Sequence, residues 1–425
     1  MKKIFACICL LYINFFSFAQ SADKIINAKE ALRIETFLAS DELKGRKPGT
    51  PEIDKAAGFI AKEFKTSGLK YFEGLSGYLQ SFTNIRSKFI SAGATIDGEK
   101  IEEANVIAIT TDSLLEITEK SAFAKVIISN TENLLQRAED ILNAKKNQLV
   151  LVNSFFINDF KKLRRYKKDG TKTDFSVVFV LTNNTADKYN IEIKHKITST
   201  NYSNVVAVLP GKSRKNEIVI FSGHFDHLGV GKPNALGDSI YNGANDDAAG
   251  TTAVIMLSNY FAKLKNNERT LVFVAFTAEE TGGFGSQYFS RQVDPEKVVA
   301  MFNLEMIGTE SKWGKNSAYI TGFEKSDFGK ILQNNLSGSA FRFEPDPYPK
   351  ENLFYRSDNA TLAALGVPAH TISTSKMDNE PTYHKQSDDI ASIDIDNMTE
   401  IIKAIALSSK TIVSGKDTPT RVEKK

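Results

Sequence analysis

Cysteine is nearly absent from this chain of 425 residues, which has only Cys7 and Cys9, both within the first ten positions. The rest of the chain can therefore form neither a disulfide framework nor a zinc site built on thiolates. Any metal site there must use histidine and carboxylate ligands.

Excess charge of one sign is also missing. Lys and Arg total 54 against 51 Asp and Glu, a formal net charge of +3, to which Lys2 and Lys3 contribute two. Nothing in this balance indicates nucleic acid or another polyanionic partner. The composition, 41% hydrophobic and 25% charged, is that of a globular protein large enough for one large domain or two smaller ones.

Long apolar runs are missing too, apart from residues 4–18, which follow Lys2 and Lys3. That run ends in Ser17-Phe18-Ala19, with small residues where a signal peptidase cleaves, so residues 1–19 are typical of a bacterial secretory signal. A membrane anchor would need roughly 20 apolar residues. We expect export to the periplasm or the extracellular medium, with no stable membrane insertion once the signal is removed.

Hydrophobic periodicity divides the remaining chain into segments of different character. Residues 20–86 are largely helical, residues 87–203 carry short β-like runs, residues 204–414 repeat strand, loop and helix, and residues 415–425 form a polar tail. The alternation in the third segment predicts an α/β fold with a mostly parallel sheet covered by helices. We interpret 87–203 as a small, β-rich inserted or cap domain.

The predicted strands of the third segment are 218–221, 271–276, 298–304, 318–320 and 369–372, and the predicted helices are 250–264, 284–291, 327–335, 359–365 and 394–409. In a mostly parallel sheet, polar chemistry gathers at the carboxyl ends of the strands. Acids and histidines at these positions are therefore the candidate functional residues.

The first strand leads into His224-Phe225-Asp226-His227. Residues two apart in an extended chain point to the same side, so His224 and Asp226 are expected together, with the carboxylate orienting the imidazole. By the same alternation His227 points elsewhere, and we favour a structural role for it.

Acidic groups also follow the next elements. A loop bounded by glycines, 243–250, holds Asp246 and Asp247, either of which could simply cap the following helix. Glu279 and Glu280 follow the second strand and repel one another unless a proton or cation lies between them; an exposed acidic turn is the alternative. Glu305 follows the third strand.

A last histidine, His384, stands beside Tyr383 in a polar loop near the C-terminus. Together with His224, Asp246, Glu280 and Glu305 it makes a set of two imidazoles and three carboxylates. Oxygen and nitrogen donors of this kind suit two zinc ions.

In this order the motifs resemble the M28 family of zinc aminopeptidases and related peptidases. The resemblance covers most of the chain after residue 20 and is weakest over 87–203. It is carried by the metal segments above and by residues 40–50, 355–359 and 383–384.

The resemblance implies a zinc metallopeptidase that removes N-terminal residues from peptides. It makes His224 and Glu305 ligands of one zinc, Glu280 and His384 ligands of the other, and Asp246 the bridge between them. Glu279 becomes the general base for a metal-bridging hydroxide, Asp226 the partner of His224, and Tyr383 a hydrogen-bond donor to the oxyanion.

Two positions depart from the pattern of the family, and a third allows two roles. Glu305 stands where many relatives have Asp, and Asn359 stands where His often follows Ser-Asp. Arg356 either holds the terminus of the substrate or forms a plain ion pair.

Two other functions remain open from the sequence. One is a zinc acyltransferase similar to glutaminyl cyclases, which hold a single zinc. The other is a non-catalytic binding module on the peptidase fold. Neither the side-chain preference nor the oligomeric state follows from the sequence.

Overall fold

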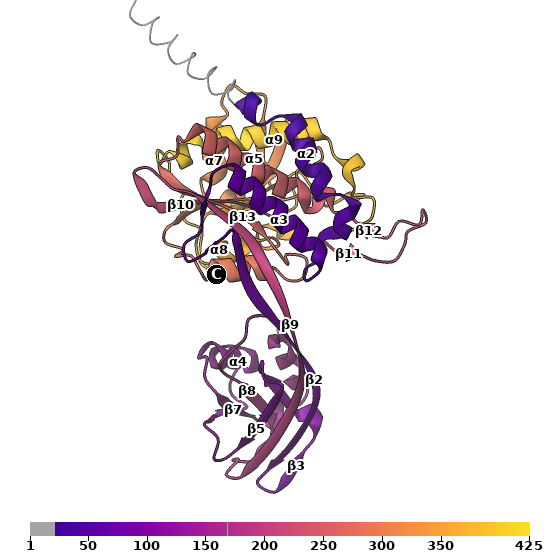
Figure 1. Ribbon diagram of the computed structural model, residues 1–425. Helices are drawn as coiled ribbons and strands as arrows, with labels where there is room; N and C mark the ends of the chain where they lie inside the picture. Colours follow the sequence, from indigo (N-terminus) through magenta and orange to yellow (C-terminus); the bar gives the residue numbers. More distant parts are fainter. Residues whose placement is uncertain (1–21, 168) are drawn as a thin grey trace, which may run out of the picture. The chain divides into compact units, whose positions relative to one another are not determined.

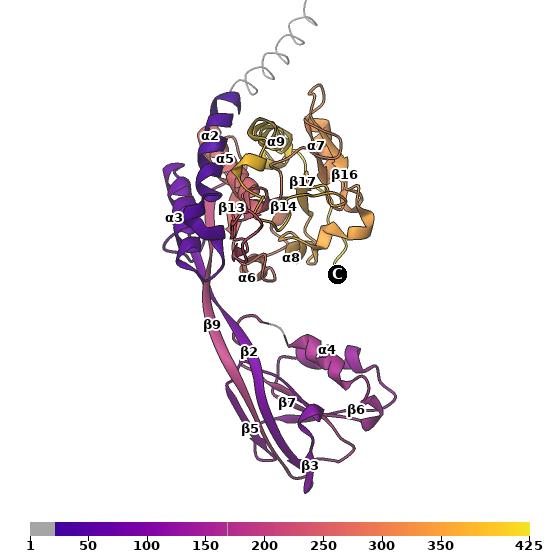
Figure 2. The same cartoon turned by 90° about the vertical axis from the view of Figure 1, so that its right-hand side faces the viewer.

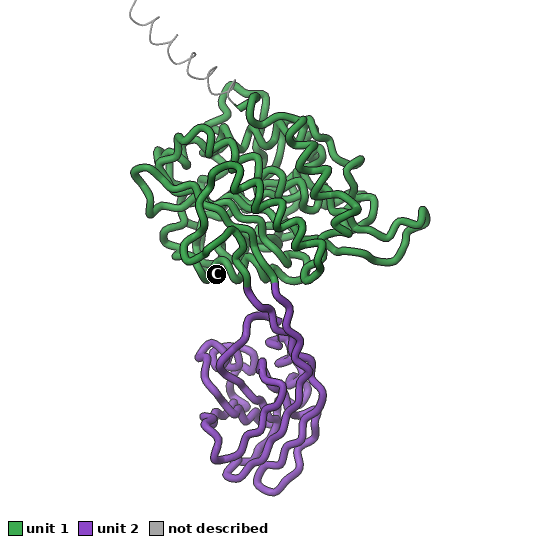
Figure 3. Tube along the Cα trace, in the orientation of Figure 1, with its two compact units in different colours: residues 1–81, 202–425 green, residues 82–201 purple. Residues whose placement is uncertain are grey.

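A computed structural model of the chain describes residues 22–167 and 169–425 (Figure 1). Its described residues divide into two compact units, one formed by residues 22–81 and 202–425 and the other lying within residues 82–201 (Figure 3). The predicted signal peptide, 1–19, lies outside the described residues. Within the described part, no helix combines the length and the apolar character that a membrane span requires.

The first unit is built on a mixed sheet whose centre is parallel. Strands β17, β14, β10 and β13 run parallel to one another, β9 pairs antiparallel with β13, and β15 pairs antiparallel with β17. This arrangement confirms the predicted α/β class. In sheet order the strands are β16 (Arg342–Pro345), β15 (Ser317–Ile320), β17 (Ala369–Ser373), β14 (Val298–Leu304), β10 (Arg214–His224), β13 (Arg269–Phe276) and β9 (Tyr189–Leu209), with β1 (Lys70–Tyr71) paired to the end of β9.

Helices cover both faces of this sheet (Figure 2). On β10, Val219 and Phe221 belong to one hydrophobic cluster, and Ile220 between them belongs to another. Because neighbouring strand residues point to opposite faces, both faces are buried. One face packs against α2 (Ala28–Leu38), α3 (Pro51–Thr66), α5 (Ala249–Leu264), α7 (Phe328–Asn335), α9 (Ile395–Ser408) and α10 (Lys410–Val413), and the other against α6 (Phe284–Ser290) and α8 (Ala360–Ala363).

The N-terminal helices show how local sequence sets their ends. Asn27 caps α2 by accepting the backbone N–H of Glu30 at 3.1 Å. Helix α3 begins with Pro51, whose fixed φ suits the first helical position, and it buries Ile60 and Phe64, four residues apart on one face.

The second unit contains two sheets and a helix. Strands β2 (Leu79–Ile96), β3 (Glu99–Ile101), β5 (Leu114–Thr118) and the first part of β9 form one antiparallel sheet. The second sheet has the order β4 (Val106–Ile109), β8 (Val177–Leu181), β7 (Gln148–Val152), β6 (Ala124–Ile128), and α4 (Leu134–Asn143) packs against it. One apolar cluster joins the two sheets.

Short elements complete the chain. The hairpin β11 (Gly229–Val230) and β12 (Ile240–Tyr241) and the irregular turn η5 (Ala244–Ala248) lie between β10 and α5. The 3₁₀ turns are η1 (Asp41–Arg46), η2 (Glu103–Asn105), η3 (Ser154–Phe156), η4 (Phe160–Tyr166), η6 (Phe323–Lys325), η7 (Pro349–Glu351), η8 (Leu353–Tyr355) and η9 (Ile390–Ser392).

Candidate metal centre

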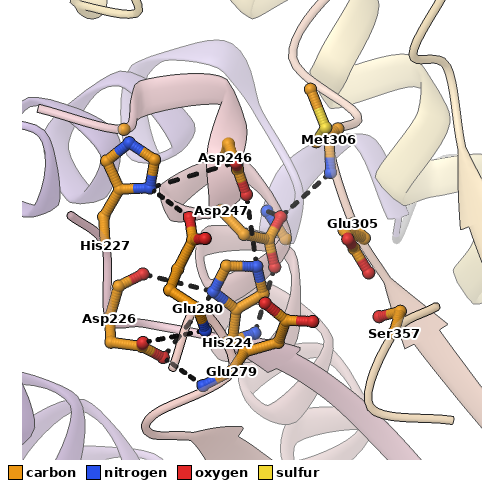
Figure 4. Close-up of polar contacts among 12 residues, drawn as sticks. His224, Asp226, His227, Asp246, Asp247, Glu279, Glu280, Glu305, Met306 and Ser357 are labelled. Atoms are coloured by element: carbon orange, nitrogen blue, oxygen red, sulfur yellow. Dashed lines mark hydrogen bonds and ion pairs between the residues drawn. The ribbon is translucent and has the colours of Figure 1, made fainter. Parts of the chain in front are cut away.

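Three parallel strands deliver acidic and imidazole groups to the same edge of the sheet. His224 is the last residue of β10 and pairs with Phe276, the last residue of β13, three positions before Glu279. Glu305 directly follows β14, the strand on the other side of β10. The side chains converge at the carboxyl ends of these strands, where a parallel sheet places its polar chemistry (Figure 4).

The turn η5 brings Asp246 into this cluster. Gly243 precedes it with a φ of 58°, and a Cβ there would lie 2.3 Å from the Asp246 carbonyl oxygen, so only glycine fits. The carboxylate of Asp388 accepts the backbone N–H groups of Asn245 at 2.8 Å and of Asp246 at 3.0 Å. A residue 142 positions away in sequence thus fixes the position of Asp246.

The carboxylate of Asp246 lies between imidazoles. Its Oδ1 is 3.2 Å from Nε2 of His224, and its Oδ2 is 3.3 Å from Nε2 of His384. The Oε2 atom of Glu280 lies 3.1 Å from the same His384 nitrogen. The two oxygens of Asp246 therefore face two separate groups of donors, as a bridging carboxylate does.

Several atoms of this cluster are buried and have no hydrogen-bond partner in residues 22–167 and 169–425. They are Nε2 of His224, both ring nitrogens of His227, Oδ2 of Asp246 and Oε1 of Glu280. Leaving polar atoms unpaired in the interior costs free energy. A divalent cation among them would satisfy these lone pairs, and a donor set of imidazoles and carboxylates suits zinc.

The carboxyl groups around the cluster are buried, and burial changes their pKa values. Burial raises the pKa of Asp226 and of Glu305 to about 7 and that of Asp358 to about 6. Burial, reinforced by the Glu305 and Asp358 carboxylates, raises the pKa of Glu279 well above its usual range. Burial alone would lower the pKa of His224, but the carboxylates of Asp246, Asp247 and Glu279 outweigh it, and the result lies well above the ordinary value.

Asp226 orients the Glu-Glu turn as well as His224. Its carboxylate accepts the backbone N–H of Glu279 at 3.0 Å and of Glu280 at 3.3 Å. Nδ1 of His224 lies 3.2 Å from the Asp226 carbonyl oxygen and 3.7 Å from its carboxylate. Its nearest contact with His224 is thus through the backbone rather than the carboxylate.

Glu305 lies to one side of the imidazoles. Its Oε2 accepts a hydrogen bond from Asn303 Nδ2 at 3.4 Å, and Ser357 lies beside its carboxyl group (Figure 4). Among the described residues, no ion pair joins it to His224. Of the five predicted ligands, four are linked by successive contacts, from His224 to Asp246, from Asp246 to His384 and from His384 to Glu280, and Glu305 lies beside them.

The predicted substrate-facing residues lie in exposed loops. The ring of Tyr383 stacks on that of His384, with centroids 3.9 Å apart, and is 36% exposed. Arg356 forms an exposed ion pair with Glu351 at 3.2 Å. Asn359 donates hydrogen bonds to the carbonyls of Phe354 and Ala369, which is a structural use of that position.

Strand alternation predicted that the His227 side chain points away from His224 and Asp226. In the structure it instead points into the same cluster. The strand β10 ends at His224, so the period of two no longer applies. The completely buried ring instead brings Nδ1 to 2.7 Å from Oε1 of Glu280 and to 3.9 Å from Oδ2 of Asp246. With Asp246 and Glu280 it forms a group of potential metal ligands whose donor atoms lie within 4.8 Å of one another.

The residue directly before α5 is Ala248, but the Asp247 carboxylate accepts a hydrogen bond from the first turn of that helix and two more from other segments. This carboxylate accepts the backbone N–H groups of Gly250 at 3.0 Å, of His224 at 3.1 Å and of Met306 at 3.0 Å. One buried side chain therefore links helix α5 to the ends of β10 and β14. The cis peptide bond of the turn joins Asp246 to Asp247.

Arg46 is a second positioning residue to which the sequence assigned no role. Its fully buried guanidinium donates to the carbonyls of Phe225 at 2.7 Å and of Gly243 at 2.8 Å, and also to those of Leu38 and Asn242. It fastens the loop after β10 to the loop before η5. The only sequence signal was its place in the segment 40–50.

Comparison with known proteins agrees with this geometry. The sequence pattern of Peptidase family M28 matches residues 204–408. A probable zinc metalloprotease of Pyrenophora teres f. teres is 33% identical over 123 residues, which cover 28% of this chain and 26% of that protein. Leucine aminopeptidase 1 of Aspergillus niger is 24% identical over 231 residues, covering 52% of this chain and 58% of that protein.

Solved structures extend the likeness of fold to nearly the whole chain. The aminopeptidase from Aneurinibacillus sp. strain AM-1 superposes with a TM-score of 0.55 at 18% identity, covering 93% of this chain and 96% of that one. The chain spans only about a quarter of the length of the first curated relatives it matches. On its fold, its cluster of ligands and its sequence pattern, the segment 204–408 belongs to peptidase family M28.

Proposed function

We propose that this protein is a two-zinc metallopeptidase that removes single residues from the free N-termini of peptides. The observation that carries the proposal is the Asp246 carboxylate, with Oδ1 facing His224 and Oδ2 facing His384. A carboxylate placed in this way is suited to hold two ions side by side.

The donors present fit two zinc ions. His224, Asp246 and Glu305 would hold one of them, and Asp246, Glu280 and His384 would hold the other. Zinc at such a site lowers the pKa of water and polarises the carbonyl group of a substrate. The unpartnered, buried atoms of the cluster support this assignment, because a cation gives them the partner they lack.

Glu279 serves as the general base in this proposal. It takes a proton from the attacking water and returns it to the nitrogen of the leaving amine. A base needs a pKa near the working pH, and burial moves that of Glu279 upward. The hydrogen bond from its backbone N–H to Asp226 holds the turn that carries it.

Tyr383 donates a hydrogen bond to the carbonyl oxygen of the scissile bond as negative charge develops on it. Its ring is partly exposed and stacks on His384, so its position is tied to a proposed ligand. Arg356 forms an exposed ion pair with Glu351, so we assign it this structural role rather than that of holding the terminus of the substrate.

The carboxylates around the site favour a positively charged end of the substrate. Glu279, Glu280 and Glu305 place negative charge around the proposed zinc positions, and this charge attracts an α-ammonium group. The aminopeptidases of similar fold support the same direction of attack.

The test compares leucyl peptides that have a free or an acetylated N-terminus, with products identified by mass spectrometry. We expect stepwise removal of N-terminal residues and no turnover when the amine is blocked. Equal cleavage of the two substrates would reject the exopeptidase activity. Cyclisation of an N-terminal glutamine, without peptide cleavage, would instead favour the glutaminyl cyclase function, since a Porphyromonas gingivalis glutaminyl cyclase shares the fold at a TM-score of 0.50.

We also propose that the protein works outside the cytoplasm, on the basis of residues 1–19. N-terminal sequencing of the protein recovered from cell fractions tests this. We expect an N-terminus at residue 20 in the exported fraction, and an intact N-terminus in the cytoplasm would contradict export.

A further inference from the structure

His227 has no role in the ligand set assigned above, yet it lies against that set. Its ring is completely buried, and Nδ1 lies 2.7 Å from Oε1 of Glu280 and 3.9 Å from Oδ2 of Asp246. Within the described part of the chain, neither ring nitrogen has a hydrogen-bond partner, and the two carboxylate oxygens that face it have none either.

The short approach of His227 to Glu280 is a contact that a shared cation would explain. Nδ1 of His227 lies 2.7 Å from Oε1 of Glu280, and neither atom has a hydrogen-bond partner among the described residues. A ring nitrogen and a carboxylate oxygen can each offer a lone pair to the same ion. Tetrahedral zinc with bonds of about 2.0–2.2 Å places neighbouring ligand atoms roughly 3.3–3.6 Å apart, and the donor atoms of His227, Asp246 and Glu280 lie within 4.8 Å of one another, so small shifts of the side chains suffice to hold an ion.

The surroundings hold His227 in this orientation. Its backbone N–H donates to the carbonyl of Arg46 at 3.3 Å. A Cβ on Gly243 would lie 2.5 Å from the His227 ring, so the loop before η5 packs directly on the imidazole. The ring therefore lies in contact with both the Arg46 segment and the Asp246 loop.

We propose that Nδ1 of His227 is an additional protein ligand of the ion held by Asp246, Glu280 and His384. The inference rests on the proposed metal site, and it makes the two ion positions unequal. One position has four protein ligands, two of them imidazoles. The other has three: His224, Asp246 and Glu305.

The unequal number of protein ligands should make the two positions differ in zinc affinity and in the availability of an open coordination position. Zinc sites with four protein ligands are closed and bind the ion as part of the fold, whereas catalytic sites with three keep a position open. The His227 position should therefore be filled first and emptied last. The His224 position should exchange its ion more readily and present the open coordination position.

The wild-type protein provides the direct test. We expect X-ray absorption spectroscopy of protein loaded with one zinc per chain to report two imidazole ligands on that ion. A single imidazole would overturn the proposal. This measurement needs no variant and therefore does not depend on the folding of a mutant.

The zinc affinity of variants tests the same assignment of His227 as a ligand. Zinc retained against competing chelators is measured for His227→Gln, for His224→Gln and for His195→Gln, a buried histidine of the second unit with no hydrogen-bond partner. We expect His227→Gln to weaken the tighter site more than about 100-fold, beyond the 10–100-fold range of residues that only orient a ligand. His224→Gln should spare that site, and His195→Gln should spare both.

Thermal unfolding separates coordination from packing. A ligand contributes when zinc is bound, so His227→Gln should reduce the rise in melting temperature that zinc produces in the wild type. Equal loss of stability with and without zinc, or a loss of affinity of less than 100-fold, would overturn the assignment. Wild-type protein that binds two ions but cleaves no peptide would reject the proposed function and leave the His227 assignment intact, because none of these measurements uses activity.

Discussion

The carboxylate of Asp226 accepts the backbone N–H of Glu279 at 3.0 Å, and its second oxygen accepts that of Glu280 at 3.3 Å. A single buried side chain thus holds the turn that carries both the proposed base and a proposed ligand. The same residue approaches His224 through its carbonyl oxygen. Asp226 therefore positions three groups of the site, and its removal should disturb all of them.

Asp226→Asn replaces one acceptor oxygen with an NH₂ group that faces a backbone N–H donor. We expect zinc affinity to fall about 10–100-fold, the usual effect of losing a residue that orients a ligand, with a loss of turnover. Asp294→Asn is the matched control, because Asp294 also accepts a backbone N–H, that of Glu296 at 3.0 Å, but in an exposed turn. Titration of zinc into the apo-proteins measures the effect, and unchanged affinity in Asp226→Asn would contradict it.

Glu279 and Glu280 are adjacent but have different expected roles. Glu280→Gln should lose zinc and activity together, because Oε2 of Glu280 lies within the cluster, 3.1 Å from His384. Glu279→Gln should keep about two zinc ions per chain and lose roughly 10²–10⁴-fold in turnover, the usual share of a general base. Bound zinc and turnover are measured on the same purified samples. If Glu279→Gln lost zinc while Glu280→Gln kept it, the roles of base and ligand would be reversed.

Arg46 and Arg356 form a second informative pair. Arg46 is fully buried and donates to four backbone carbonyls, so Arg46→Met removes four buried hydrogen bonds, although the carbonyl of Gly243 keeps the one from the Ala248 N–H. We expect the free energy of unfolding to fall by about 3 kcal/mol or more. Arg356→Ala removes only an exposed ion pair and should cost at most about 1 kcal/mol. Urea unfolding measures both values, and similar costs would contradict the positioning role of Arg46.

Glu35 should make stability depend on pH. It is completely buried beneath α5, its Oε2 accepts a hydrogen bond from Thr252, and burial raises its pKa to about 8. The raised pKa means that the folded state keeps the proton while the unfolded chain loses it above about 4.5. The contribution of Glu35 is therefore fully present below that pH and is lost as pH rises toward 8.

Glu35→Gln removes this titration. We expect the stability of the variant relative to the wild type to increase between pH 5 and 8, by at most about 1.4 kcal/mol per pH unit. Glu30→Gln on the same helix is the control, because the hydrogen bond from Arg33 lowers the pKa of Glu30 below 4.5, so its titration lies below this range and the stability of Glu30→Gln relative to the wild type should stay constant between pH 5 and 8. Urea unfolding across this pH range decides the matter, and parallel curves for wild type and Glu35→Gln would contradict the prediction.

The sequence predicted the centre of the fold well, because buried parallel strands read as continuous apolar runs. The predicted strand 298–304 coincides with β14, and the predicted helix 250–264 differs from α5 by one residue. The 18-residue strand β2 and the 21-residue strand β9 escaped detection, because buried and exposed residues alternate along parts of them and form no continuous apolar run. The four-residue edge strand β16 was also missed.

Within the site, residues at strand ends could be found, whereas those fixed by tertiary contacts could not. His224 and Glu305 follow from their places directly at the ends of apolar runs. The orientation of His227 depends on a loop conformation that periodicity does not describe. Arg46 acts on Phe225, 179 positions away in sequence, and Asp388 acts on Asp246, 142 positions away. Hydrogen bonds over such separations leave no local pattern.

The second unit, residues 82–201, is expected to affect which peptides are cleaved rather than whether zinc is bound. None of the proposed ligands lies in it. The hydroxyl groups of Ser81 and Ser203 lie 2.9 Å apart, so a short glycine-rich turn can join the chain at this point. The shortened protein retains Asn204, whose Oδ1 accepts the backbone N–H of Thr277 at 3.2 Å, near the start of the turn that carries Glu279.

We expect the shortened protein to bind as much zinc as the full chain, because every proposed ligand and its supporting contacts remain. We expect its preference among peptides of different length to change, in line with the cap role predicted for the inserted segment. Zinc content and the relative kcat/KM for leucyl peptides of two to ten residues measure the two effects. A linker variant that replaces only the exposed loop 233–238, between β11 and β12, controls for surface changes in the first unit. If the shortened protein is folded and binds zinc but keeps the length preference of the full chain, the cap role is rejected.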